Sequence, residues 1–279
     1  MREAFRFLLR SGRGRMGVAL IGVFVLIALF GDVLAPYDPL KAEAVPLEGI
    51  SSAHPFGVDA FGRDEFSRIL SAALPMLRIT IFSVLISGVI GTALGVLAGW
   101  RHGFVDNLTM RALDVVLAFP LLVLAIGIVA FFGVGERNVT VALAIAFIPG
   151  FARVARAGTL TVIQEPYVAA ARSIGDRGFT IMRREVLPNI FPVVLVQASL
   201  SSAYAILAES ALSFLSLSVQ PPDASWGRML AEGRDFLSNA PHLAVIPGLM
   251  ITFVVIGFNL LGDGLRDFLD PRLRDKVAR

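Results

Sequence analysis

Long continuous runs of apolar residues alternate with short polar connections along the chain. A helix that crosses a bilayer needs about 20 mostly apolar residues. Six stretches approach or reach this length, at residues 16–35, 79–100, 112–132, 139–154, 191–217 and 243–261. Because their apolar residues are contiguous rather than alternating, the pattern favours helices over the strands of a membrane barrel. The predicted fold class is therefore all-α, a polytopic membrane protein with six transmembrane helices.

Three of these predicted spans are unusual. The first, at 16–35, is longer than the apolar core of about 7–15 residues in a signal peptide, so we expect an uncleaved helix. The fourth is short and is interrupted by Pro149 and Gly150. The fifth is the least apolar, because it contains several serines and Glu209.

The distribution of basic residues predicts the topology. With six spans both termini lie on one side of the membrane, together with the connection at 153–188. This side carries 18 of the 25 Lys and Arg residues. Cytoplasmic connections carry the basic excess, so we expect both termini and the 153–188 loop in the cytoplasm. The segments 38–78 and 216–242 are then external, and the protein is a multi-pass protein of the plasma (inner) membrane. Trp100 and Trp226 lie near span ends, where aromatic belts form.

Composition narrows the function classes. The chain is 56% hydrophobic and 17% charged, and it has no cysteine, so thiolate metal sites and cysteine nucleophiles are excluded. A basic pI of about 9.8 is explained by arginines between apolar blocks, and no nucleic-acid partner is expected. The sequence has no G-x-x-x-x-G-K-[ST], H-E-x-x-H or G-x-S-x-G motif, and its three histidines are scattered. We therefore expect no enzyme activity, no catalytic residue, no metal and no cofactor.

Two features within the spans suggest specific packing. Gly91, Gly95 and Gly99 are four residues apart, which places them on one helix face where another helix can approach closely. Glu209 is an ionisable residue inside a span, and such residues are costly in a bilayer. Two interpretations of Glu209 are open: it faces a polar path through the membrane, or it makes a structural hydrogen bond to a neighbouring helix.

The 153–188 loop predicts two short cytoplasmic helices joined by a sharp turn. The first helix covers 167–174 and ends at Gly175. The second covers about 179–186 and ends at Leu187 and Pro188. The first helix has small side chains that allow another surface to dock closely. The residues of interest in this loop are Tyr167, Ala169, Ala170, Ala171, Arg172, Gly175, Arg183, Arg184, Leu187 and Pro188.

This loop resembles the coupling ("EAA") motif of ATP-binding-cassette (ABC) importer permeases. That motif reads E-A-A, three residues, Gly, and a stretch that ends in I/V-L-P. Ala169 stands where the family has glutamate, whereas Gly175, Leu187 and Pro188 match. Further segments resemble the "C" subunits of dipeptide, oligopeptide and nickel permeases: HPFGVDAFGRDEFSRIL, FVDNLTMRALDVVLAFP, ESALSFLSLSVQPPDASWGRML and NLLGDGLRDFLDPRLR.

The resemblance implies a type I ABC importer permease fold and a set of partners. These are a "B"-type permease, two ATP-binding-cassette ATPases, an external solute-binding protein and the lipid bilayer. The ATPases would act on the 153–188 loop, and the cargo would be peptides or related small solutes such as nickel complexes. The implied domains are a tail, first helix and external linker at 1–75, a permease core at 76–268 and a C-terminal tail at 269–279. The 216–242 segment either caps the helices or contacts the binding protein.

Three other function classes are considered. An ion-coupled secondary transporter would need buried ion sites and often internal repeats, and no convincing inverted repeat is present. An intramembrane aspartyl protease would need a second aspartate to match Asp263 in Gly262-Asp263-Gly264, and the residues around Asp114 do not fit. A purely structural scaffold would have no use for the cytoplasmic helix pair.

Overall fold

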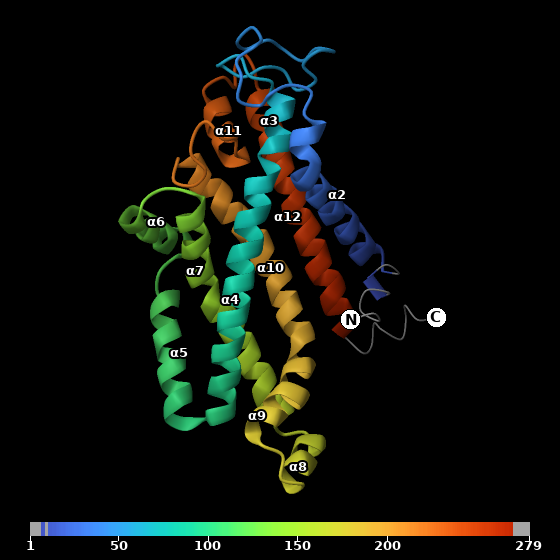
Figure 1. The fold of residues 1–279 in the computed structure, drawn as a ribbon, viewed down its shortest axis with the longest axis vertical. Helices are drawn as coiled ribbons and strands as arrows, with labels where there is room; N and C mark the ends of the chain where they lie inside the picture. The colour runs from blue at the N-terminus through green and yellow to red at the C-terminus, as the bar shows by residue number, and fades with distance from the viewer. Residues whose placement is uncertain (1–6, 9–10, 270–279) are drawn as a thin grey trace.

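The structure is a computed structural model that describes residues 7–8 and 11–269, and this part of the chain is almost entirely helical (Figure 1). Residues 1–6, 9–10 and most of the expected C-terminal tail lie outside the described residues. The helices are α2 (Gly12–Leu34), α3 (Glu65–Ser71), α4 (Ala73–Arg101), α5 (Gly103–Leu117), α6 (Leu121–Phe132), α7 (Glu136–Val162), α8 (Pro166–Ser173), α9 (Gly178–Ile181), η1 (Met182–Val186), α10 (Leu187–Phe214), α11 (Trp226–Arg234) and α12 (His242–Leu269). The η1 segment is a π-helical turn.

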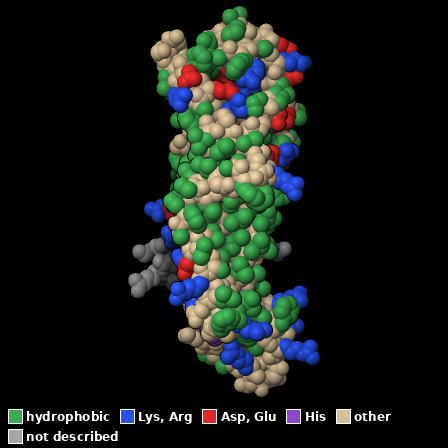
Figure 2. Space-filling model, turned by 90° about the vertical axis from the view of Figure 1, so that its left-hand side faces the viewer, with side chains coloured by type: hydrophobic (Ala, Val, Ile, Leu, Met, Phe, Trp, Pro, Cys, Tyr) green, Lys and Arg blue, Asp and Glu red, His purple; other side chains and the backbone are tan. Residues whose placement is uncertain are grey.

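Among the described residues, five helical segments are long and apolar enough to cross a bilayer. They are Gly12–Leu34, Glu65–Arg101, Glu136–Val162, Gly178–Phe214 and His242–Leu269. Hydrophobic side chains cover the middle of the face shown in Figure 2, and charged side chains gather toward the two ends. This distribution matches a body whose middle is surrounded by lipid chains.

The third predicted span differs from the expectation of one continuous helix. Residues 112–132 are divided between α5 and α6, and the chain bends by 86° at the short break between these two helices. Neither helix is long enough to be a span by itself, so they form a sixth span only if the bent pair is taken as one. The break contains Pro120, which cannot donate a backbone hydrogen bond and disfavours helical backbone at Phe119. By contrast, α7 continues without a break through Pro149, so the fourth span is longer than predicted.

The second cytoplasmic helix does not end at Leu187 and Pro188, and this prediction is wrong. The chain from α9 through η1 into α10 is one continuous helical segment. Pro188 lies in the first turn of α10, where a missing N–H is tolerated. The π-helical turn precedes it, and the Leu187 N–H donates to the carbonyl of Met182.

The two ends of the helical body carry different segments. The 38–78 segment and α11 lie together at the upper end in Figure 1, and α8 and α9 lie at the lower end. Arg63 and Glu232 form an ion pair of 3.5 Å that ties the first segment to α11. The two segments expected outside thus share one end, and the loop expected in the cytoplasm occupies the other.

Trp226 does not lie in a lipid-facing aromatic belt, contrary to the expectation. Its side chain is fully buried, against Phe24 among other residues, and its Nε1–H donates to the carbonyl of Ile69 at 3.0 Å. Trp226 therefore joins α11 to α3, and the 216–242 segment caps the upper ends of the helices.

Candidate functional site

The turn after α8 depends on one glycine. Gly175 has φ +88°, a backbone conformation that residues with a Cβ rarely adopt. The Gly175 N–H donates to the carbonyl of Arg172, and the Asp176 N–H donates to that of Ala171, both at 3.1 Å. This pair of bonds is a Schellman motif, which ends a helix and satisfies its last carbonyls. Gly175 therefore sets the direction in which the chain leaves α8.

A small apolar cluster fastens α8 to the ends of the long helices. Val168 is fully buried, and Ala171 packs against the same cluster. The other buried members come from α4, α7, α9, η1 and α10: Val96, Ala155, Val162, Ile181, Val186 and Ile190. Because these residues come from several spans, α8 is packed directly against the ends of the long helices.

Trp100, at the end of α4, adds a second attachment. The Arg172 guanidinium lies over its ring at 5.2 Å from the centroid, a cation–π contact. A Cβ added to Gly178 would lie 3.1 Å from the same ring. Trp100 thus contacts the chain on both sides of the Gly175 turn, a role that its position in the sequence did not reveal.

The outward face of this region is a mixture of small, apolar and basic side chains. Ile174 and Phe179 are 81% and 72% exposed. Most residues of the predicted docking surface are exposed. They are Tyr167, Ala169, Ala170, Arg172, Gly175, Arg183, Arg184, Leu187 and Pro188. Partial desolvation, and then the carboxylates of Glu165 and Glu185, raise the pKa of the Tyr167 phenol. Tyr167 therefore remains neutral and able to donate a hydrogen bond.

An apolar groove of about 920 Å³ runs along α4 and α10 and reaches the α9 region. Gly88 and Phe151 line its wall, and Phe179 and Met182 lie at its α9 end. Arg183 is the one charged side chain among the described residues that line it. Such a surface suits contact with another apolar helix or with a largely uncharged solute.

The glycine row of α4 lies against α7. A Cβ added to Gly91 would lie 2.6 Å from both the Ile148 carbonyl oxygen and the Phe151 Cβ. At Gly95 an added Cβ would collide with the Ala152 carbonyl, and at Gly99 it would lie 2.9 Å from the Thr159 Cβ.

Glu209 is fully buried and does not line the groove. Its Oε1 accepts hydrogen bonds from the hydroxyls of Ser213 at 2.7 Å and Ser218 at 3.1 Å. These serines lie at the end of α10 and in the segment that follows, on either side of Ser216 with φ +60°. The carboxylate thus links the end of α10 to the chain that leaves it.

Two ion pairs between α5 and α7 were not predicted. Arg156 makes a bidentate contact with Asp106, with 2.6 Å between Nη2 and Oδ2. Arg153 Nη2 lies 2.6 Å from Asp114 Oδ1. The charged residues are visible in the sequence, but their pairing depends on the relative position of two helices that are about 40–50 residues apart along the chain.

These features define an integral membrane permease, with helical spans, an apolar groove along them and an exposed helix and turn at one end. Residues 91–275 match the family described as "Binding-protein-dependent transport system inner membrane component", and the chain belongs to this family. Residues 1–47 match the N-terminal TM domain of oligopeptide transport permease C.

Individual relatives agree with this family. The chain is 44% identical to the glutathione transport system permease protein GsiD of Pectobacterium atrosepticum over 98% of this chain and 91% of that protein. It is 40% identical to the dipeptide transport system permease protein DppC of Alkalihalophilus pseudofirmus, over 98% and 90% respectively. Its fold resembles a chain of the inward-facing MetNI methionine ABC transporter, with a TM-score of 0.58 and 17% identity over 76% of this chain and 97% of that one.

The chain is therefore a transmembrane permease subunit of an ABC importer with a type I fold, as its sequence suggested. In this family the ATPase is a separate subunit, and the permease is not itself an enzyme. The ion-coupled carrier, the intramembrane protease and the structural scaffold are set aside on the same grounds.

Proposed function

We propose that this chain is the C-type permease of an importer for small peptides such as glutathione or a dipeptide. The names of two relatives with 44% and 40% identity over nearly the whole chain support this cargo class. A B-type permease would form the other half of the membrane body, two ATPases would bind in the cytoplasm, and a solute-binding protein would deliver cargo from outside. Both termini of the chain would be cytoplasmic, in agreement with the excess of arginine on that side.

The proposed coupling to separate ATPases rests on one observation, the construction of the α8 region. Its outer side is exposed, and its inner side is packed against the spans. Ile174 and Phe179 are exposed apolar groups for a partner protein to cover, and Arg172 supplies charge at the same surface. Val168 and Trp100 hold the region to the spans. When the ATPases close on ATP, they would move this surface, and the attached helices would turn the path outward.

We also assign roles to the groove, to the glycine row of α4 and to Glu209. The groove along α4 and α10 forms part of the translocation path or of the contact with the second permease, because it is apolar and open. Gly91, Gly95 and Gly99 let α4 and α7 move as one body. Glu209 has a structural role at the end of its own helix, since it is fully buried and bonded to Ser213 and Ser218 rather than exposed to the groove.

The test is Gly175→Val in the complete transporter, reconstituted into liposomes with its ATPases and solute-binding protein. Valine at φ +88° is strained by about 1–2 kcal/mol or more, so the turn would change direction. We expect ATP hydrolysis to persist while uptake of labelled glutathione or dialanine falls about tenfold or more. Gly175→Asn is the matched control, because asparagine tolerates this conformation and should retain uptake. Equal uptake by the wild-type and Gly175→Val transporters would refute the coupling role.

A further inference from the structure

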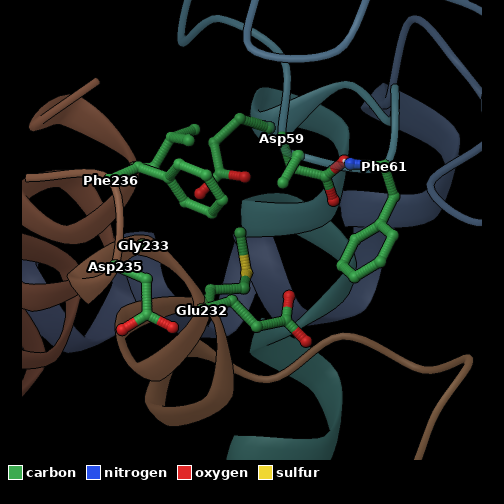
Figure 3. A pocket seen from close by; sticks show the side chains of 10 residues that line it. Asp59, Phe61, Glu232, Gly233, Asp235 and Phe236 are labelled. Carbon is green, nitrogen blue, oxygen red and sulfur yellow. The ribbon is translucent and has the colours of Figure 1, made fainter. Parts of the chain in front are cut away.

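A second cavity lies at the end of the molecule opposite α8. It has a volume of about 340 Å³ and opens between α11 and the chain that precedes α3 (Figure 3). Four carboxylates line it, from Asp59, Glu65, Glu232 and Asp235. The apolar part of its wall includes the rings of Phe61 and Phe236 and the side chain of Met229. None of its lining residues also lines the apolar groove.

Three of the four carboxylates already have basic partners. Asp59 Oδ2 lies 2.6 Å from Arg63 Nε and 3.5 Å from Arg68 Nε. Glu232 Oε1 accepts from Arg228 Nε at 2.8 Å. Asp235 pairs with the neighbouring Arg234 at 3.1 Å. These carboxylates are therefore neutralised within the chain.

Glu65 is different, because its side chain is almost completely buried and yet incompletely bonded. The residue is 2% exposed, and its Oε1 has no hydrogen-bond partner among the described residues. A buried polar oxygen without a partner is costly, and native proteins rarely leave one without a reason. Since Glu65 lines the open cavity, a group that enters from outside can supply the missing donor.

We propose that this cavity receives a lysine or arginine side chain of the docked solute-binding protein, with the Glu65 carboxyl as its acceptor. A cationic donor to a buried carboxylate makes a strong, charge-assisted hydrogen bond. The cavity is at the small end of ligand pockets, so it suits one side chain rather than a whole solute. The exposed Phe61 ring at its mouth offers a cation–π surface, as its contact with Arg63 at 4.8 Å illustrates.

The position of the cavity favours a protein side chain over the cargo or a metal ion. The cavity is separate from the groove that we assign to translocation, so cargo need not pass it. Within the described part of the chain, no three or more His, Asp or Glu side chains, these four carboxylates included, are placed so that together they could hold a metal ion. This inference rests on the proposed function, because it requires the α11 end to face the solute-binding protein.

The test measures binding of the purified solute-binding protein to the complete transporter in lipid nanodiscs. We expect Glu65→Gln to weaken this binding about tenfold, because glutamine cannot become an anionic acceptor when the cation binds. Asp38→Asn is the matched control: this exposed carboxylate lies at the same end and pairs with Lys41, and its loss should leave binding unchanged. Ala60→Trp, which fills the cavity from its wall, should weaken binding as well. This variant replaces Glu65→Gln as the test if the Glu65→Gln permease does not assemble with its partner subunits.

A photo-crosslinker at Phe61 identifies the inserted side chain. Substitution of the captured Lys or Arg by Gln should weaken binding to the wild-type transporter, and it should add little in the Glu65→Gln background. Unchanged binding in both Glu65→Gln and Ala60→Trp overturns the inference. The inference is also overturned if these variants raise the uptake KM for glutathione or dialanine but leave the affinity for the solute-binding protein unchanged. That result would mean that cargo occupies the cavity. If the wild-type transporter itself shows no ATPase stimulation by its loaded binding protein, the proposed function fails instead.

Discussion

Replacement of Gly91 by alanine should destabilise the permease through the contact of α4 with α7. The added Cβ would lie 2.6 Å from the Ile148 carbonyl oxygen and from the Phe151 Cβ. Ordinary contact begins at about 3.4 Å, so the helices must separate locally by about 0.8 Å, at a cost of about 1–3 kcal/mol for overpacking. Neither neighbour is the far end of a flexible side chain, so neither can swing aside.

The assay is thermal unfolding of the purified transporter in detergent or nanodiscs, with Gly88→Ala and Gly127→Ala as matched controls. A Cβ at Gly88 would meet the Phe151 ring at 3.5 Å, an ordinary contact, and a Cβ at Gly127 would meet nothing within 4 Å. Both controls should unfold at or above the wild-type temperature, since alanine favours helix over glycine by roughly 0.5–1 kcal/mol. If Gly91→Ala unfolds at the same temperature as Gly88→Ala, the close approach of α4 and α7 is refuted.

Three further predictions use the same unfolding assay. Trp226→Phe removes the hydrogen bond to the Ile69 carbonyl and leaves that carbonyl buried without this donor. This should lower the free energy of unfolding by about 1–3 kcal/mol, and an unchanged unfolding midpoint would contradict the role of Trp226. Asp106→Asn removes the bidentate ion pair with Arg156 and should cost about 1 kcal/mol, with a double-mutant cycle as the check. Val168→Ala opens a cavity in the cluster under α8 and should cost about 1–3 kcal/mol; a full wild-type midpoint would argue that α8 is not anchored there.

The α8 turn could be predicted from sequence because its determinants are local. Gly175 follows a run with helical preference, and a helix that ends in left-handed backbone usually has glycine there. The structure accordingly has α8 at Pro166–Ser173 and φ +88° at Gly175. The next proline was misread because the same residue type has two roles: Pro188 is compatible with the first turn of a helix, and only the continuation from η1 into α10 reveals which role applies.

Other parts of the site could not be predicted, because they depend on partners far apart in the chain. Arg172 was named as a surface group, but its contact with Trp100 joins the 153–188 loop to the end of α4. Glu209 had two open interpretations, a polar path or a hydrogen bond to a neighbouring helix, whereas its bonds go to Ser213 of its own helix and to Ser218 of the segment that follows. The sequence could not show that Glu65 Oε1 is buried without a partner, because the cavity around Glu65 is formed together with residues of α11.

The sequence by itself determined the membrane-spanning class and the family. Apolar runs of about 20 residues partition from water into lipid whatever their neighbours in the fold are. In lipid, the backbone groups of such a run must form their hydrogen bonds within a helix. Tertiary structure decided the break at Pro120, the burial of Trp226 and the grouping of four carboxylates at one end. These outcomes depend on which helices meet, and helix contacts in a membrane arise from packing between distant segments rather than from hydropathy.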